Sequence, residues 1–282
     1  MSDQRRQDGG KSYWLRPDPD NDSLTVPLKA VGRNGELIES RIAAEHPLVV
    51  SLNGREIVTL MTIGDHPDLL AVGHMLNQDV MHADDEVLGI ENDPSTGTIN
   101  IRIARETDTE VADPSPGGAA DTAYRNLMAG LREIELDSKA ALRTSWLHPL
   151  QKIINTTPSL YAEAGALHGC VLCRQERPLV YMEEIGRHNA IDKVAGYMFL
   201  NQVPPEDKML YSTGRLTHGM VIKSIKMRIP ILLSRSGFTG WGVDIARQTG
   251  LTLVGRVSGK RFIVVAGGDR VVDDFDEVRA ES

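Results

Sequence analysis

The fold can be worked out from residues 179–193, which read Leu179-Val180-Tyr181-Met182-Glu183-Glu184-Ile185-Gly186-Arg187-His188-Asn189-Ala190-Ile191-Asp192-Lys193. The β-rich run Leu179–Met182 predicts a strand. After the turn at Gly186, apolar residues recur at helical spacing and predict the buried face of a helix, formed by Ile191, Val194, Ala195 and Met198. A strand, a polar glycine turn and a helix in succession are typical of α/β domains.

The same alternation continues through the second half of the chain. Further strands are predicted near residues 171–173, 209–212, 229–233, 251–257 and 262–265, and further helices near 218–228 and 243–248. Alternating strands and helices predict a three-layer α/β domain over residues 122–272.

The first half is richer in strands. Asn53-Gly54 separates two apolar runs and predicts a β-hairpin. A helix is predicted over about 67–79, and the alternation of residues 99–103 predicts a half-buried strand. We therefore expect a smaller, strand-rich α+β domain over residues 23–105.

Three polar segments flank these domains. Residues 1–22 are rich in Asp, Arg, Gly and Pro and are expected to form a tail, because they bury too little apolar surface to offset their ordering entropy. Residues 106–121 are expected to form a loop or linker. Residues 273–282 are interpreted as a solvated acidic tail.

Composition excludes several classes of protein. The 282 residues are 41% hydrophobic and 25% charged, which is typical of globular chains, and the formal net charge of −8 disfavours nucleic-acid binding. No apolar run approaches the roughly 20 residues that span a bilayer, and the first residues lack a secretory signal. Two cysteines provide no disulfide framework, so we expect a soluble, cytoplasmic protein with no membrane partner.

Four loops of the second half combine glycine with cationic or hydroxyl side chains next to a predicted strand. They contain Gly186-Arg187-His188, Ser212-Thr213-Gly214-Arg215, Ser234-Arg235-Ser236-Gly237-Phe238-Thr239 and Arg256-Val257-Ser258-Gly259-Lys260-Arg261. Glycine lets the backbone approach a phosphate, and Arg donates two parallel hydrogen bonds to one. Ligands of α/β sheets bind beyond the carboxyl ends of the strands. A single loop of this kind is more often an ordinary tight turn with a solvated charge, but the recurrence of four predicts a small anionic ligand such as a nucleotide.

Cys170 and Cys173 form a lone Cys-x-x-Cys pair after His168-Gly169. The pair is a candidate for carrying persulfide sulfur, exchanging disulfides or binding metal, but residues three apart on a strand point to opposite faces. An inert pair of core cysteines is the alternative. Zinc would need two more ligands, and His168 and His188 are the nearest histidines; we predict no metal site.

Residues 183–193 resemble the E-D-V-G-R-H-N-A-x-D-K motif of the formate dehydrogenase accessory sulfur-carrier (FdhD) family. Gly214-Arg215, Met220-Val221-x-Lys223, Ile229–Leu232 and Gly250–Gly255 continue the resemblance in order, and it covers roughly residues 24–272. It implies a cytidine-deaminase-like fold for the second domain, without the zinc site of those enzymes.

The resemblance also implies a function. Members of this family take sulfur from a cysteine desulfurase as a persulfide and pass it to the molybdenum bis(molybdopterin guanine dinucleotide) cofactor of a formate dehydrogenase. They are usually dimers. Their cofactor-binding stretch corresponds here to Arg256–Arg261, which agrees with the basic loops found above.

One motif of the family does not occur in this chain. The family's sulfur-bearing C-G-x-C-G should fall near residues 114–120, which read Pro-Ser-Pro-Gly-Gly-Ala-Ala. Whether the chain is an enzyme therefore stays open. The first hypothesis is a sulfurtransferase using Cys170 or Cys173. The second is a non-catalytic module that binds the molybdenum cofactor or a guanine nucleotide and chaperones its insertion. The third is a nucleotide-handling enzyme using His188 and the surrounding acids, with Asp192 in the same turn.

Overall fold

The computed structural model describes residues 13–106, 119–137 and 139–275, and the chain divides into two compact units. The first unit contains the chain up to residue 104 together with 152–173 and 177–203, and the second contains 105–151, 174–176 and the chain from 204 onward. The expected mixed α/β architecture is confirmed. The units divide the chain differently from the predicted domains, because the helix that follows Gly186 packs with the N-terminal elements.

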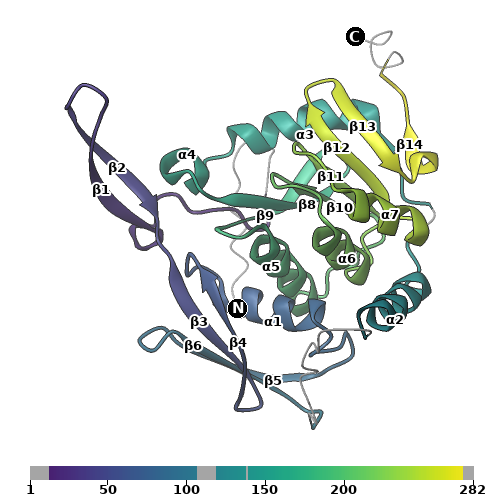
Figure 1. The fold of residues 1–282 in the computed structure, drawn as a ribbon, viewed down its shortest axis with the longest axis horizontal. Coiled ribbons are helices and arrows are strands. Elements are labelled where there is room, and N and C mark those ends of the chain that lie inside the picture. Colours follow the sequence, from purple (N-terminus) through teal and green to yellow (C-terminus); the bar gives the residue numbers. More distant parts are fainter. Residues whose placement is uncertain (1–12, 107–118, 138, 276–282) are drawn as a thin grey trace. The chain divides into compact units, whose positions relative to one another are not determined.

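Two of the sheets of the first unit come from the N-terminal part of the chain. The strand order in one is β4-β3-β6-β5, and β1 and β2 form an antiparallel ribbon of their own (Figure 1). The helices and strands of the first unit are η1(Asp22–Leu24), β1(Thr25–Val31), β2(Leu37–Ala43), β3(His46–Leu52), β4(Arg55–Thr62), α1(Pro67–Asn77), β5(Val87–Asp93), β6(Thr98–Ile103), α4(Leu160–Ala164), β8(His168–Arg174, whose last residue belongs to the second unit), β9(Arg177–Glu184) and α5(Arg187–Leu200).

The predicted hairpin at Asn53-Gly54 is confirmed. β3 and β4 pair antiparallel, with Leu52 opposite Arg55, and both turn residues have positive φ (49° and 81°). Asn and Gly are the residues that adopt this left-handed conformation most readily, so the turn and the register agree. The side chain of Asn53 also accepts a hydrogen bond from the backbone nitrogen of Ile103 at 2.9 Å.

Helices α1 and α5 approach each other closely, and two glycines permit it. A Cβ on Gly73 would overlap the carbonyl oxygen of Asp192 and lie 2.6 Å from the backbone nitrogen of Gly196. A Cβ on Gly196 would overlap the carbonyl oxygen of Leu69. The backbones therefore touch with no side chain between them, which ties the helix after the Gly-Arg-His turn to the N-terminal elements.

Residues 13–22 differ from the expected tail. The backbone nitrogen of Trp14 donates to the carbonyl of Leu179 at 2.7 Å, and that of Tyr181 donates to the carbonyl of Leu15 at 2.9 Å. The phenol of Tyr13 lies 2.6 Å from the hydroxyl of Thr157. These bonds pair backbone groups on the outer edge of β9 and so stabilise the segment. The polar composition of residues 13–22 gives no indication of this pairing. The first twelve residues lie outside the described part of the chain.

The second unit contains a parallel sheet with one antiparallel edge. Strands β10, β11 and β12 pair in parallel, β13 returns antiparallel to β12, and α6 and α7 pack against these strands (Figure 1). Its elements are α2(Ala119–Glu133), β7(Leu142–Arg143), α3(Thr144–Thr156, whose last turn belongs to the first unit), β10(Met209–Ser212), α6(His218–Lys226), β11(Ile231–Ser234), α7(Gly240–Thr249), β12(Thr252–Ser258), β13(Arg261–Ala266), η2(Gly268–Arg270) and β14(Val271–Val272). Among the described residues, no helix is both long and apolar enough to cross a membrane.

The two other polar segments also differ in part from expectation. The helix α2 begins at Ala119, inside the predicted linker 106–121, whose residues 107–118 lie outside the described part. At the C-terminal end Asp274 is buried and hydrogen-bonded rather than solvated. Residues 276–282 of the predicted acidic tail lie outside the described part.

Candidate functional site

The loop between β12 and β13 is shaped by backbone conformation and by one side chain. Gly259 has φ +59° at the turn, and Arg256 also has a positive φ of 54°, at an irregularity in the pairing of the two strands. The side chain of Gln151 bridges the loop: its amide donates to the carbonyl of Val257 and its oxygen accepts from the nitrogen of Gly259, both at 2.7 Å. A left-handed arginine is unusual, and such strain concentrates at functional sites.

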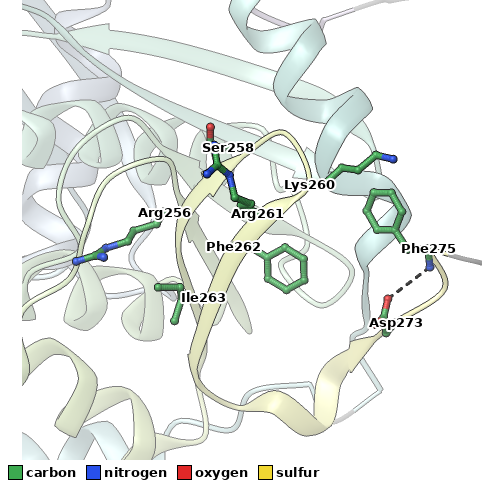
Figure 2. A pocket seen from close by; sticks show the side chains of 8 residues that line it. All are labelled: Arg256, Ser258, Lys260, Arg261, Phe262, Ile263, Asp273 and Phe275. Atoms are coloured by element: carbon green, nitrogen blue, oxygen red, sulfur yellow. Dashed lines mark hydrogen bonds between the residues drawn. The ribbon is translucent and has the colours of Figure 1, made fainter.

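A pocket of about 910 Å³ adjoins this loop, within the size range of small-molecule sites. Its walls combine cationic, hydroxyl, aromatic and acidic side chains (Figure 2), namely Arg256, Ser258, Lys260, Arg261, Phe262, Ile263, Asp273 and Phe275. Figure 2 shows Lys260 and Phe262 on the side of the hairpin that faces Phe275, whereas Arg256 and Ile263 point to the other side.

The charge of the pocket is not neutralised by the protein itself. Arg256, Lys260 and Arg261 form no ion pair with any residue that the structure describes, and all three are exposed. Cations that line a concave surface without ion-pair partners attract an anion, and a guanidinium group can bind two phosphate oxygens at once. The pocket therefore has the chemistry of a site for a phosphate-bearing ligand.

The residues of the predicted stretch Arg256–Arg261 do not all line this pocket. Four of its members line the walls, whereas Val257 is buried and Gly259 forms the turn. The sequence missed four lining residues, Phe262, Ile263, Asp273 and Phe275, and it missed Gln151, which holds the loop. The sequence contained one sign of the C-terminal wall of the pocket, because Phe275 is a lone aromatic residue in an acidic stretch. Nothing in the sequence near Gln151 indicated its contact with the loop.

Three predicted loops meet at the carboxyl edge of β10, β11 and β12. The hydroxyl of Ser234 donates to the carbonyl of Gly214 at 2.7 Å and accepts from the nitrogen of Ser236 at 2.9 Å. The nitrogen of Arg256 donates to the carbonyl of Ser236 at 2.8 Å. The structure thus brings Gly214, Ser234 and Arg256 together, as the shared strand-end position predicted.

The side chains at this edge have different surroundings. Arg215 and Arg235 are exposed, and Thr239 caps the N-terminus of α7 by accepting from the nitrogen of Gly242 at 3.4 Å. Ligand contacts of Gly214, Arg215, Ser234, Arg235 and Thr239 stay predictions.

The Glu-Glu-Ile-Gly-Arg-His block lies in the first unit, and much of it forms a buried polar network. The ammonium group of Lys193, which has no exposed surface, lies 2.6 Å from Glu184 and also pairs with Asp65. Glu184 accepts hydrogen bonds from the hydroxyl of Thr62 and, at 3.3 Å, from the nitrogen of Ile63. These side chains join β9 and α5 to the end of β4, so a large part of the block has a structural role.

Two further acidic groups of the block are held in the interior. Asp192 accepts from the amide of Asn77 at 2.7 Å and lies 3.3 Å from Nδ1 of His74. Burial raises the pKa of Glu183, even though the backbone nitrogen of Leu160 donates to it at 2.7 Å and lowers the pKa. Asp192 thus faces α1, although the sequence grouped it with His188.

Gly186, Arg187 and His188 form the beginning of α5. Gly186 is its N-cap, and all three residues are only partly buried. They belong to the first unit, while the basic pocket belongs to the second. Their roles in binding a ligand stay predictions.

Cys170 and Cys173 lie on β8 and have no exposed surface. Burial raises the pKa of the Cys170 thiol, and the negative charge of Asp192 raises it further. Burial also raises the pKa of Cys173 well above its usual value. Because the thiolate is the nucleophile, both thiols are unreactive in this conformation. Their assignment as catalytic residues stays a prediction that requires β8 to open.

The fold and the pocket define a class: a mixed α/β protein with a pocket lined in part by cationic side chains beside the carboxyl edge of a parallel sheet. The match to a family model is more specific. Residues 43–272 match the model of the FdhD/NarQ family, so the chain belongs to that family.

Named relatives and a solved structure agree with this assignment. The sulfur carrier protein FdhD of Bacillus pumilus (strain SAFR-032) is 27% identical over 243 residues, which cover 82% of this chain and 90% of the relative. The protein of that name from Bacillus subtilis (strain 168) is 26% identical over 260 residues, covering 89% and 99%. A crystal structure described as a formate dehydrogenase accessory protein, from Desulfotalea psychrophila, superposes with a TM-score of 0.74 at 25% identity, over 88% of this chain and all of that one.

Proposed function

We propose that this chain is an accessory sulfur-carrier protein in the maturation of a formate dehydrogenase. The observation that carries the proposal is membership of the FdhD/NarQ family over residues 43–272, together with relatives named sulfur carrier proteins. The partners would be a cysteine desulfurase as the sulfur donor and a formate dehydrogenase-type molybdoenzyme as the client, and the chain would act as a homodimer.

The lining of the basic pocket favours a specific cargo for the carrier, the molybdenum bis(molybdopterin guanine dinucleotide) cofactor. This molecule carries phosphate groups and planar rings. Arg256, Lys260 and Arg261 supply positive charge that no described carboxylate pairs with, and Phe262 and Phe275 supply apolar surface for rings. The residues present therefore fit the cargo, which would be bound here while its sulfur is delivered.

Ligand binding can be tested with one arginine. We expect Arg261→Gln to weaken the binding of inorganic pyrophosphate by about tenfold, because a charge-assisted hydrogen bond to phosphate is lost. Isothermal titration calorimetry measures the change. Arg177→Gln removes another exposed arginine, at the start of β9, and should leave binding unchanged. Equal affinities of the two variants would contradict a phosphate site at this pocket.

The sulfur-transfer step could use only the sulfur atoms of Cys170 and Cys173. The chain has two cysteines, so any cysteine persulfide must form on Cys170 or Cys173, and both are buried. A desulfurase can reach them only when β8 separates from its surroundings. Sulfur loading should then be limited by that opening rather than by the chemistry of exchange.

Intact-mass spectrometry after incubation with a cysteine desulfurase and cysteine tests this step. We expect a gain of one sulfur that is lost in one of the two variants Cys170→Ala and Cys173→Ala, which identifies the carrier. The gain should be faster in a low concentration of urea. Iodoacetamide should label neither thiol in the native protein and both in the unfolded one. No gain of mass in a folded, pyrophosphate-binding protein would contradict sulfur carriage.

The burial of both thiols favours a second candidate function. In it the chain binds the molybdenum cofactor or a guanine nucleotide at the basic pocket and chaperones its insertion, with no covalent sulfur. Absence of a mass gain together with retained ligand binding is the result that this candidate predicts.

A further inference from the structure

Residues 13–15, which we call the N-terminal strap, lie along the outer edge of β9 as an additional short strand. The backbone nitrogen of Trp14 donates to the carbonyl of Leu179 at 2.7 Å, and the nitrogen of Tyr181 donates to the carbonyl of Leu15 at 2.9 Å. The pairing with β9 is parallel. The strap precedes the region that matches the family model, so it is a feature that the family match does not include.

The two aromatic side chains of the strap have different surroundings. Trp14 is half exposed, whereas Tyr13 is partly buried and its phenol lies 2.6 Å from the hydroxyl of Thr157. The Thr157 hydroxyl donates its own hydrogen to the carbonyl of Ile153 at 2.8 Å, so the phenol of Tyr13 is the donor in the bond to Thr157. Tyr13 therefore fastens the strap beside the end of α3.

The strap is attached to the hairpin that carries Cys173. Strand β8 ends at residue 174, β9 begins at residue 177, and the two strands are neighbours in the sheet, so Cys173 lies across from the first residues of β9. The strap is bonded to β9 close to that end, at Leu179 and Tyr181. The hairpin thus brings the strap and one of the two thiols together.

The charges around each thiol indicate which face of β8 it occupies. Burial, with a smaller contribution from an ionised Cys173, raises the pKa of the Tyr13 phenol to about 12, even though the bond to Thr157 lowers it. After burial, the carboxylate of Asp192 on α5 is what raises the pKa of Cys170. Residues three apart on a strand point to opposite faces. Cys173 therefore faces Tyr13 of the strap, and Cys170 faces α5.

The strap is the part of this region that opens most easily. A terminal segment held at one edge by a few hydrogen bonds opens locally far more often than two paired strands separate. Pro17, just beyond the strap, is buried and keeps that end of the segment in place. Release of residues 13–15 therefore costs less free energy than separation of β8 from β9.

We propose that the N-terminal strap is a displaceable cover of Cys173, and that its release is the opening through which a sulfur donor reaches that thiol. Cys170 stays inaccessible in this opening, because it faces α5. The inference rests on the proposed function, since it assigns the gate and the acceptor thiol of the sulfur-loading step.

Release of the strap would expose Cys173 to water, where the thiol can lose its proton to solvent. The Cys173 thiolate then bonds to the terminal sulfur of the donor's cysteine persulfide, and the sulfur–sulfur bond of the donor breaks. The donor leaves as a cysteine thiolate and Cys173 becomes the persulfide, so the step needs no oxidant or reductant.

Iodoacetamide labelling of full-length, single-thiol variants tests the cover. Cys170→Ala leaves Cys173 as the one thiol, and Cys173→Ala leaves Cys170. Adding Tyr13→Ala should accelerate the labelling of Cys173 roughly tenfold, because the ring and its hydrogen bond are lost, and should leave the labelling rate of Cys170 unchanged. Intact-mass spectrometry of the native protein over time measures both rates.

Trp14→Ala is the matched control. It removes the neighbouring aromatic side chain of the strap, which is half exposed, and keeps the backbone bond to Leu179, so neither labelling rate should change. Thr157→Val removes only the hydrogen-bond acceptor of Tyr13 and should accelerate the labelling of Cys173 by a smaller factor than Tyr13→Ala. Equal acceleration of both thiols by Tyr13→Ala, or no acceleration at Cys173, would overturn the cover.

Sulfur loading separates the inference from the function on which it rests. With a cysteine desulfurase and cysteine, Tyr13→Ala should also accelerate the gain of one sulfur on Cys173. Faster iodoacetamide labelling of Cys173 without any gain of sulfur supports the cover and contradicts the sulfur-carrier function. A gain of sulfur that is lost in Cys170→Ala and unaffected by Tyr13→Ala supports that function and overturns the inference.

Discussion

Gly196→Ala is expected to lower the free energy of unfolding by about 3 kcal/mol, because the added methyl group has nowhere to go. Its Cβ would overlap the carbonyl oxygen of Leu69 and lie 2.8 Å from the carbonyl carbon. Both atoms are backbone, so no side-chain rotation relieves the clash, and α1 and α5 must separate. Urea denaturation followed by circular dichroism measures the loss.

Gly130→Ala is the matched control. Gly130 lies in helix α2, is exposed, and has no atom within 4 Å of a Cβ placed on it. The same substitution there should raise stability by about 1 kcal/mol, because alanine is the better helix former. If Gly196→Ala were as harmless as Gly130→Ala, the close contact between α1 and α5 would be wrong.

Lys193→Met should cost about 3–5 kcal/mol of stability, because it removes the positive charge from a buried group of carboxylates. Lys193 has no exposed surface, and neither does Glu184, its partner at 2.6 Å, while Asp65 completes the group. Methionine keeps most of the volume of the side chain, so the expected loss is electrostatic rather than a cavity. Thermal and urea unfolding both measure it.

Two further variants identify the cause. Lys29→Met removes a lysine whose ion pair with Glu39 is exposed and 3.9 Å long, and it should change stability by less than about 1 kcal/mol. Adding Glu184→Gln to Lys193→Met should restore part of the stability, because one uncompensated charge disappears. A double variant no more stable than the single one would show that packing, not charge, explains the loss.

The elements that local chemistry specifies could be predicted from the sequence. Asn53-Gly54 predicted the hairpin because few residue pairs adopt that turn, and apolar spacing predicted α1 to within two residues. The basic loop at Arg256–Arg261 was predicted from its composition and from the family resemblance, and four of its six residues line the pocket.

What could not be predicted depends on contacts between residues distant in the sequence. Lys193 and Asp192 look like the exposed charges of a helix start, and only their meeting with Asp65, Glu184 and Asn77 makes them interior groups. Asp274 looks like part of a solvated tail until Ser145 and Arg143 lie beside it. The composition of a short segment predicts its behaviour when it is exposed to solvent. Asp192, Lys193 and Asp274 are buried by residues distant in the sequence, so composition alone does not predict their role.

The burial of both native thiols makes this chain suitable for site-specific spectroscopy without further engineering. A cysteine introduced at the exposed Ser258, in the wall of the basic pocket, would be the one thiol that a maleimide dye reaches in the folded protein. The attached fluorophore would report when the pocket fills and empties, in real time and in the presence of partner proteins.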